Sequence, residues 1–427
     1  MWTRQSGNRL GMLFPRQDRG ASMSFIMLAV LIDMMSIGII VPVLPILVGS
    51  FTGSQADQAF WYGVVAFSFA IANFFASPVL GALSDHYGRR PVLLLGFFGL
   101  ALNFFATALA TAIWMLIAAR LVGGAMQANI SVANAYVADI TPPEERAKRF
   151  GMLGAMFGVG FILGPVTGGL LGAIDLQLPF FVAGALGLLN LLYGYFVVPE
   201  SLPLDKRRAF DRNAINPLKS LGALVQLKGV GSLVAVVACS GLAQFVLYTS
   251  WVLYTSFKFG WGPRENGWAL AVVGVVSVIV QGFLLGRLLK LFSPRRLTVL
   301  GLVSSTFAYV GYGVITESWM MYAIICANLL GVTVTASIQS IISGAAGARE
   351  QGQTMGAVSA INSLMAVIAP ALGAPLLVMV SHLPKGDWRI GAPFYFCAVL
   401  QAVALVLATL HFRRERHARA AAQRALG

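Results

Sequence analysis

Apolar residues occur along the chain in twelve long runs separated by short polar stretches. Each run is at least as long as the roughly 20 residues that a helix needs to cross the hydrocarbon core of a bilayer. The pattern therefore predicts an all-α membrane protein with twelve transmembrane helices. The runs cover residues 24–48, 60–83, 91–110, 112–138, 150–173, 179–198, 230–256, 265–289, 297–316, 318–344, 355–381 and 391–412.

The twelve runs divide into two equal sets around one long polar segment. We predict an N-terminal six-helix bundle over 1–198, a linker over 199–229 and a C-terminal six-helix bundle over 230–427. Similar glycine- and arginine-containing segments, 81–90 and 286–295, connect the second and third runs of each set. Two parallel six-helix repeats, related by a pseudo-two-fold axis, are typical of secondary transporters that bind substrate between their halves.

Composition agrees with a membrane protein and excludes several other classes. Hydrophobic residues make up 58% of the 427 residues and charged residues only 11%, whereas about 25% of a soluble domain is charged. These values exclude a soluble enzyme, a disordered chain and a secreted disulfide scaffold. The cysteines are odd in number and lie in apolar runs (Cys239, Cys326 and Cys397), so we expect no disulfide framework. The four histidines lack metal-ligand spacing, and we expect neither a metal nor a cofactor.

The net charge of +14 is distributed unevenly among the loops. The termini, the linker and the loops on one side hold 25 of the 30 Lys and Arg residues, and the opposite loops hold 4. Cytoplasmic loops carry such an excess, so we expect both termini in the cytoplasm and the chain in a bacterial inner membrane. Charge segregated in this way excludes nucleic-acid binding. The first run is too long for a signal peptide, and Met23 is an alternative start.

Two charged residues lie well inside apolar runs. Asp33 is the only such acid and Arg120 the only such base. A charge at the centre of a membrane helix costs about 2.5–3.5 kcal/mol on insertion scales, so such residues usually face a cavity or a partner. We expect Asp33 to carry the coupling proton and Arg120 to assist coupling or substrate binding. The alternatives are hydration of Asp33 near a helix end and a structural ion pair for Arg120.

Polar side chains recur with helical spacing inside several runs. In the fourth run, Arg120, Gln127 and Asn134 are seven residues apart, and Ser131 shares their face. Such a stripe either lines a cavity or forms hydrogen bonds between helices. We predict a roomy substrate cavity with aromatic walls and few charges. The further candidates for its lining are Gln244, Tyr248, Trp251, Thr255, Asn328, Thr335 and Gln339, with Asn73, Ser277, Gln281 and Asn362 as weaker single ones.

The fifth run contains a glycine repeat next to a proline. The glycines Gly160, Gly164 and Gly168 recur at every fourth residue, share one face and permit a close helix approach. Pro165 removes a backbone donor and bends the helix. The segment, which ends with Gly169, serves either packing alone or helix motion.

These motifs resemble the Major Facilitator Superfamily over the whole chain. The segment 81–90 is similar to the signature loop between its second and third helices, and 120–124 is similar to its proton-coupling motif. The segment 160–169 is similar to the motif of its antiporters, which favours export. The resemblance implies two six-helix halves and a cytoplasmic gate that contains Gly81, Asp85, Gly88, Arg89 and Arg90.

Within this superfamily, segment 33–45 resembles the first helix of the twelve-helix drug:proton antiporters. Among these, the chain resembles the tetracycline/proton antiporters in segments 89–96, 179–181, 251–255 and 259–261. Members of that group also carry acids inside the third and ninth helices, and several carry a histidine in the eighth. The matching positions here are Asn103, Ser305 and Ser277. A neutral or weakly anionic amphipathic substrate therefore suits the cavity at least as well as a cationic metal–tetracycline complex.

The sequence thus predicts a proton-coupled exporter of hydrophobic, tetracycline-like drugs that works by alternating access. The alternative is a metabolite carrier of the same fold, such as a proton symporter for a small neutral or anionic solute. No nucleophile–base arrangement or ATP-binding G-x-x-x-x-G-K-[ST] loop occurs, so we expect neither an enzyme nor an ATP-driven pump. The expected partners are a small hydrophobic substrate, protons and the bilayer, and we expect a monomer. One proton crossing about 100 mV supplies roughly 2.3 kcal/mol, which supports about a fifty-fold gradient.

Overall fold

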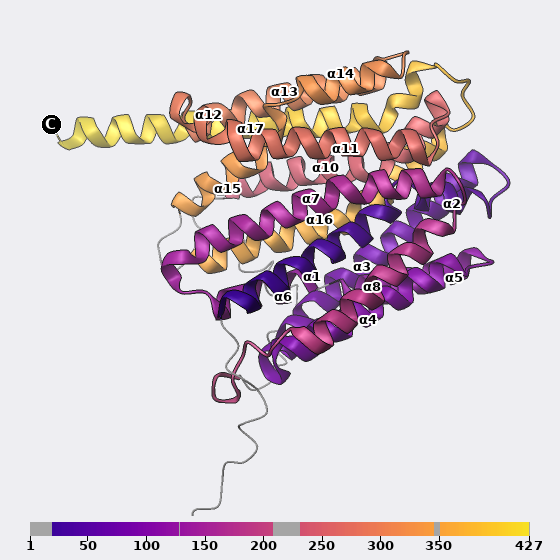
Figure 1. Ribbon diagram of the computed structural model, residues 1–427. Helices are drawn as coiled ribbons and strands as arrows, with labels where there is room; N and C mark the ends of the chain where they lie inside the picture. The colour runs from indigo at the N-terminus through magenta and orange to yellow at the C-terminus, as the bar shows by residue number, and fades with distance from the viewer. Residues whose placement is uncertain (1–18, 128, 208–230, 346–350, 427) are drawn as a thin grey trace, which may run out of the picture.

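The computed structural model describes residues 19–127, 129–207, 231–345 and 351–426. Every regular element within these residues is a helix. Figure 1 shows the helices side by side in two groups, the N-terminal half in indigo to magenta and the C-terminal half in red to yellow. Eleven helices are long and apolar enough to cross a membrane, and a bent pair forms a twelfth span. The prediction of an all-α protein with twelve membrane spans is confirmed.

The first six spans form the N-terminal half. They consist of α1 (Arg19–Ile40), α2 (Leu44–Gly49), α3 (Gln55–Tyr87), α4 (Arg89–Ala108), α5 (Ile113–Met126), α6 (Asn129–Ile140), α7 (Arg146–Gly172) and α8 (Leu178–Val197). The first span combines α1 with α2, and the fourth combines α5 with α6. Pro42 lies at the break between α1 and α2, and Pro45 follows in the first turn of α2. A proline removes a backbone donor and prevents a continuous helix.

The last six spans form the C-terminal half. They consist of α10 (Gly231–Phe259), α11 (Pro263–Ile279), a π-helical segment η3 (Val280–Leu284), α12 (Leu285–Leu291), α13 (Pro294–Val314), α14 (Trp319–Ala327), a 3₁₀ turn η4 (Gly331–Thr333), α15 (Val334–Ala345), α16 (Gln351–Val380) and α17 (Ala392–Leu426). The tenth span is the bent pair, with 52° between α14 and the half-helix that follows it. Most of the expected linker, 199–229, lies outside the described residues, and the bundle boundaries stay a prediction.

The two ends of the bundle differ in their loops. At one end of the bundle, α3 meets α4 at 87–89 and α8 ends. We call this the basic end, because the arginine-rich loops lie there. The opposite end, where α4 meets α5 at 109–112, is called the far end. The helices alternate in direction between these ends, as antiparallel neighbours joined by short loops must.

The apolar core is shared between the halves at the far end only. Two apolar clusters lie at the basic end, and each is built from one half alone. At the far end, the cluster of the C-terminal half also includes Ala59 of α3, with Ile46 and Tyr62 packed against it. The described residues therefore place the joint between the halves at the far end.

Glycine residues allow the helices to approach closely at this joint and inside the N-terminal half. A Cβ added to Gly169 of α7 would lie 2.7 Å from the Pro263 carbonyl and 3.0 Å from Gly267 Cα, both on α11. A Cβ added to Gly164 would lie 2.7 Å from Gly38 Cα on α1. Small residues permit such backbone contacts between membrane helices. Helix α7 is therefore packed tightly between two helices, α1 of its own half and α11 of the C-terminal half.

Replacing Gly164 with valine should destabilise the fold. The new side chain would overlap Gly38 and the Met35 carbonyl, and overpacking of this kind costs about 1–3 kcal/mol. Thermal unfolding of the purified protein in detergent should show a lower midpoint. Gly154→Val on the same helix is the control, because a Cβ at Gly154 meets no atom within 4 Å. Equal midpoints for the two variants would contradict the packing role.

Candidate functional site

Asp33 lies on α1 in a narrow apolar recess of the N-terminal half. Its side chain is 7% exposed, and the recess leaves about 10 Å³ of free space, which is room for about one water molecule. Within the described residues, the Asp33 carboxylate has neither an ion-pair partner nor a hydrogen-bond donor. The recess is formed by α1, α4, α6 and α7 through Ile26, Val30, Met34, Leu93, Phe97, Ala133 and Phe157.

Arg120 lies on α5 and is 4% exposed. Its Nη2 donates a hydrogen bond of 3.4 Å to Thr107 Oγ1, and its guanidinium lies 5.9 Å from the centre of the Phe69 ring. Its Nε is buried without an acceptor. Arg120 forms no ion pair with any described carboxylate, so the structural ion pair considered from the sequence is not found there. Arg120 and Asp33 do not contact each other.

The arginine-rich segment between α3 and α4 forms a compact charged cluster at the basic end. Arg89 Nη1 lies 2.5 Å from Asp85 Oδ1, and Arg89 Nε lies 3.1 Å from Asp139 Oδ2 on α6. Arg89 Nη1 also donates to Ser84 Oγ at 2.6 Å. The arginine is thus buried between acids from two helices, an arrangement of charge-assisted hydrogen bonds that fixes its geometry. All these groups belong to the N-terminal half.

Glu200, just beyond α8, closes the same cluster. Its carboxylate accepts the backbone N–H groups of Arg89 at 2.8 Å and Arg90 at 3.3 Å, at the start of α4. An anion is stabilised at a helix N-terminus because the first N–H groups lack partners within the helix. Gly88 has φ of 108°, a left-handed conformation that favours glycine. Gly81 lies one turn or more before this cluster, and a Cβ there would meet no atom within 4 Å.

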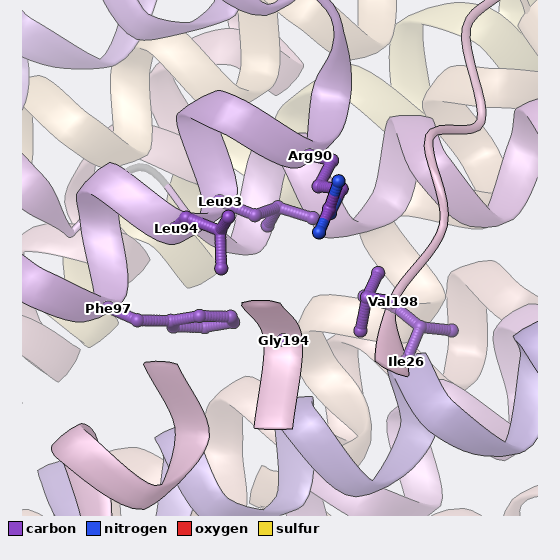
Figure 2. A pocket seen from close by; sticks show the side chains of 7 residues that line it. All are labelled: Ile26, Arg90, Leu93, Leu94, Phe97, Gly194 and Val198. Atoms are coloured by element: carbon purple, nitrogen blue, oxygen red, sulfur yellow. The ribbon is translucent and has the colours of Figure 1, made fainter. Parts of the chain in front are cut away.

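Arg90 points away from this cluster, toward α8. It donates to the Tyr195 carbonyl, and its guanidinium lies 5.7 Å from the centre of the Tyr195 ring. Figure 2 shows Arg90 at the edge of an apolar hollow between α1, α4 and α8. The hollow has no room for a water molecule, so it is a packing defect rather than a ligand site. Its other lining residues are Ile26, Leu93, Leu94, Phe97, Gly194 and Val198.

Sequence reasoning missed Asp139 and Glu200. Both acids follow directly on apolar runs, the fourth and the sixth, at the end of the bundle that carries the arginine-rich loops. The signal that could have found them is charge complementarity, since a buried arginine needs an acid nearby. Their actual pairing depends on how α6 and α8 pack against α4.

A polar cavity of about 210 Å³ lies inside the C-terminal half. It brings together three of the predicted residues, Gln244, Thr335 and Gln339, and the weaker candidate Asn362. None of the described residues that line it is charged. Three polar residues that line it, Ser240, Ser305 and Gln401, were not proposed for the lining from the sequence. The remaining lining residues are Val237, Gly241, Phe245, Gly331, Val334, Ile338 and Val358.

The other predicted cavity residues lie elsewhere. Trp251 is buried in an aromatic cluster, with ring centres 5.4 Å from Tyr312 and 6.3 Å from Phe394. Among the described residues that line the cavity, Phe245 is the only aromatic one, so the expected aromatic walls are not found there. Asn73 accepts a hydrogen bond from Ser77, Gln281 is exposed on η3, and Asn328 lies at the break of the tenth span. These three residues lie outside the lining, as do Gln127, Ser131, Asn134 and Tyr248.

The glycine motif of α7 is divided between two neighbours. Gly160, Gly164 and Gly168 face α1, which carries Asp33, whereas Gly169 faces α11. Pro165 lies inside α7, beside Gly38 of α1. The motif thus connects the helix of the buried carboxylate to the opposite half of the molecule.

Comparison with solved structures identifies the same fold in several transporters. A nucleoside transporter, NupG, matches with a TM-score of 0.75 at 12% identity, over 92% of this chain and 99% of that chain. The human organic anion transporter MFSD10 (TETRAN) matches with a TM-score of 0.69 at 20% identity, over 92% and 100%. At these identities the likeness establishes the fold.

Comparison of sequences goes further. The chain is 35% identical to the class C tetracycline resistance protein of Escherichia coli, over 86% of this chain and 92% of that protein. It is 32% identical to the class B protein of Escherichia coli (88% and 94%), and 28% identical to multidrug resistance protein 2 of Bacillus subtilis (88% and 92%). The family model of the Major Facilitator Superfamily matches residues 26–370 and 233–425. With its twelve spans, its paired six-helix halves and these matches, the chain belongs to the Major Facilitator Superfamily, the family of the tetracycline resistance proteins.

Proposed function

We propose that the protein exports hydrophobic, tetracycline-like drugs across the bacterial cytoplasmic membrane in exchange for protons. The observation that carries this proposal is Asp33, a carboxylate buried in the membrane-spanning region without a partner among the described residues. Similarity to the tetracycline resistance proteins supports the substrate class. In this proposal the protein acts as a transporter.

Asp33 suits proton coupling because its charge is not compensated locally. An ionised carboxylate in a low-dielectric site is costly unless a cation or hydrogen-bond donors surround it. A proton removes that charge, so the free energy of the Asp33 recess differs strongly between its two protonation states. Coupling requires such a difference, because a ligand shifts a conformational equilibrium only through unequal affinity for the two states.

Alternating access is supported by the asymmetric packing of the halves. They share a core at the far end, whereas at the basic end each half has its own cluster. The cavity is lined by the parts of α10, α15 and α16 nearer the basic end. With the basic end in the cytoplasm, as the Lys and Arg distribution favours, this arrangement corresponds to the state open to the cytoplasm.

A metabolite carrier of the same fold is the second candidate. The amide and hydroxyl groups of the cavity, without a formal charge, also suit a small uncharged polar solute. The direction of movement separates the two functions. An exporter lowers the amount of solute in energised cells, whereas a proton symporter raises it.

Asp33→Asn should abolish drug export. The amide has nearly the same shape but cannot bind and release the coupling proton. Drug-sensitive bacteria that make the wild type should accumulate less tetracycline than cells with empty vector, and a protonophore should remove the difference. Cells that make Asp33→Asn should accumulate as much as the vector control, with the protein present in the membrane.

Asp57→Asn is the matched control, because Asp57 is exposed in the first turn of α3 and should leave export unchanged. Full export by Asp33→Asn would overturn the coupling role. If the wild type changes neither tetracycline nor a panel of hydrophobic dyes, or raises their uptake, drug export is wrong and the metabolite carrier is favoured.

Arg89→Ala should slow turnover without changing substrate preference. The substitution leaves Asp85 and Asp139 facing each other without their shared cation, which disfavours the arrangement that the cluster holds. In everted vesicles, the maximal rate of drug transport should fall about tenfold while the apparent KM changes less than about twofold. Arg287→Ala is the control, since Arg287 bonds only to a carbonyl of its own span within the described residues. A changed substrate profile at a normal rate would count against the gating role.

A further inference from the structure

The tenth span is broken beside the polar cavity. Helix α14 ends at Ala327, and the half-helix Gly331–Gly344 continues at 52° to it. Its first residues, Gly331, Val334 and Thr335, line the cavity. The N-terminus of this half-helix therefore opens onto a space inside the membrane-spanning region rather than onto bulk water.

No side chain caps this N-terminus, because the residue before the turn η4, Leu330, makes no side-chain cap bond. The first N–H groups of any helix lack acceptors within the helix, and they carry about half a positive elementary charge. Asn328, at the break, is already engaged, since its Oδ1 accepts a hydrogen bond of 2.9 Å from Ser304 Oγ. The N–H groups of Thr333 and Val334 donate to the Leu330 and Gly331 carbonyls. Within the described residues, the donors of this terminus that remain for a ligand are therefore those of Gly331 and Val332.

Two deeply buried polar side chains in the same cavity provide an independent observation. Gln401 is 2% exposed. Its side-chain amide bonds to the Tyr309 hydroxyl, but its Oε1 has no partner among the described residues. Ser305 is 3% exposed, and no hydrogen bond to a described residue satisfies its hydroxyl. Ser305 also lies directly against the half-helix, because a Cβ added to Gly331 would meet Ser305 Oγ. Buried polar groups are nearly always paired. Other buried side chains, such as Ser250 and Ser337, also leave an atom unpaired, but Ser305 and Gln401 line the cavity and are placed to meet a ligand.

We propose that the half-helix N-terminus, Ser305 and Gln401 form a subsite for an oxygen-rich group of the substrate, a carbonyl, enolate or carboxylate. This proposal rests on the proposed transport function. It specifies that the part of the substrate bound at this subsite is neutral or anionic. The donors of the helix terminus and the Ser305 hydroxyl bind the acceptor oxygens, and Gln401 Oε1 accepts from a neighbouring hydroxyl or N–H. At about 210 Å³, the cavity holds one end of a drug-sized molecule, because complete drug sites span roughly 300–1,000 Å³.

Ser305 determines the sign of charge that the subsite accepts. A carboxylate at this position would lie against the helix N-terminus, occupy its donors and attract a cationic group instead. The proposed subsite is therefore a property of this chain that separates its substrates from cationic metal–drug complexes.

The test measures the electrostatic potential of the subsite with small charged thiol reagents. Cys239, Cys326 and Cys397 are replaced with alanine in the full-length protein, and Ser305→Cys is then introduced. The rates of modification by anionic sulfonatoethyl methanethiosulfonate and cationic trimethylammonioethyl methanethiosulfonate are measured in membranes. Their ratio cancels differences in thiol access and thiol acidity. Ser131→Cys on α6, an exposed serine of the other half, is the control.

We expect the ratio of anionic to cationic rates to be about tenfold higher at position 305 than at 131, which corresponds to about 1.4 kcal/mol. Tetracycline should slow modification at 305 and leave 131 unchanged. Thr335→Cys, in the first turn of α15 and exposed to the cavity, is a second reporter with the same expected sign if Ser305→Cys fails to fold.

An equal or reversed ratio at both reporters overturns the subsite, as does a folded protein that neither reagent modifies at either reporter. A raised ratio without protection by tetracycline at either reporter leaves the positive subsite standing and excludes tetracycline as its ligand. The reagent ratio depends neither on Asp33 nor on the direction of transport. Failure of drug export therefore appears in the accumulation assay, and failure of the subsite appears in this ratio.

Discussion

The fold depends on one constraint, that polar groups removed from water have to find partners inside the protein. Lys258, at the far end of α10, is 3% exposed, and its Nζ donates to the Gly313 carbonyl at 2.7 Å. Asn190 on α8 donates to the Ala29 carbonyl on α1 at 2.9 Å. Each of these bonds joins two helices and fixes how far one is shifted along the other. A polar side chain in an apolar bundle thus specifies which helix faces which, while apolar contacts provide most of the attraction.

Some exceptions to this constraint lie at the proposed sites, whereas others, such as Thr141, Ser250 and Ser337, lie outside them. Asp33, Ser305 and Gln401 are buried, and each leaves polar atoms without a partner among the described residues. Asn103 is a different case. Its amide is unpaired but lies against Gly123 on α5 and lines neither the Asp33 recess nor the polar cavity. Of the two positions where the resemblance implies an additional acid, only Ser305 is therefore placed to change what the cavity binds.

The sequence predicts the spans well and the site less well, for a physical reason. Bilayer thickness sets the length of every apolar run, so helix existence follows from composition alone. Helical spacing shows which residues share a face but not which neighbour that face meets. Trp251 and Gln244 lie two turns apart on α10, yet one packs in an aromatic cluster and the other lines the cavity. The break after Asn328 and the acid Glu200 depend on tertiary contacts, which no single run encodes.

The arrangement has a consequence for how proton and drug communicate. The carboxylate lies in the N-terminal half, and the polar cavity lies in the C-terminal half. Direct competition of proton and drug for Asp33 therefore does not suffice, and the coupling has to pass through the joint between the halves. Helix α7 makes both contacts, to Gly38 on α1 and to Gly267 on α11. Because these contacts bring backbones together without intervening side chains, a shift of α7 against α1 is transmitted directly to its contact with α11. Protonation that favours one packing of α1 against α7 then also favours one angle between the halves, and that angle sets the side on which the cavity opens.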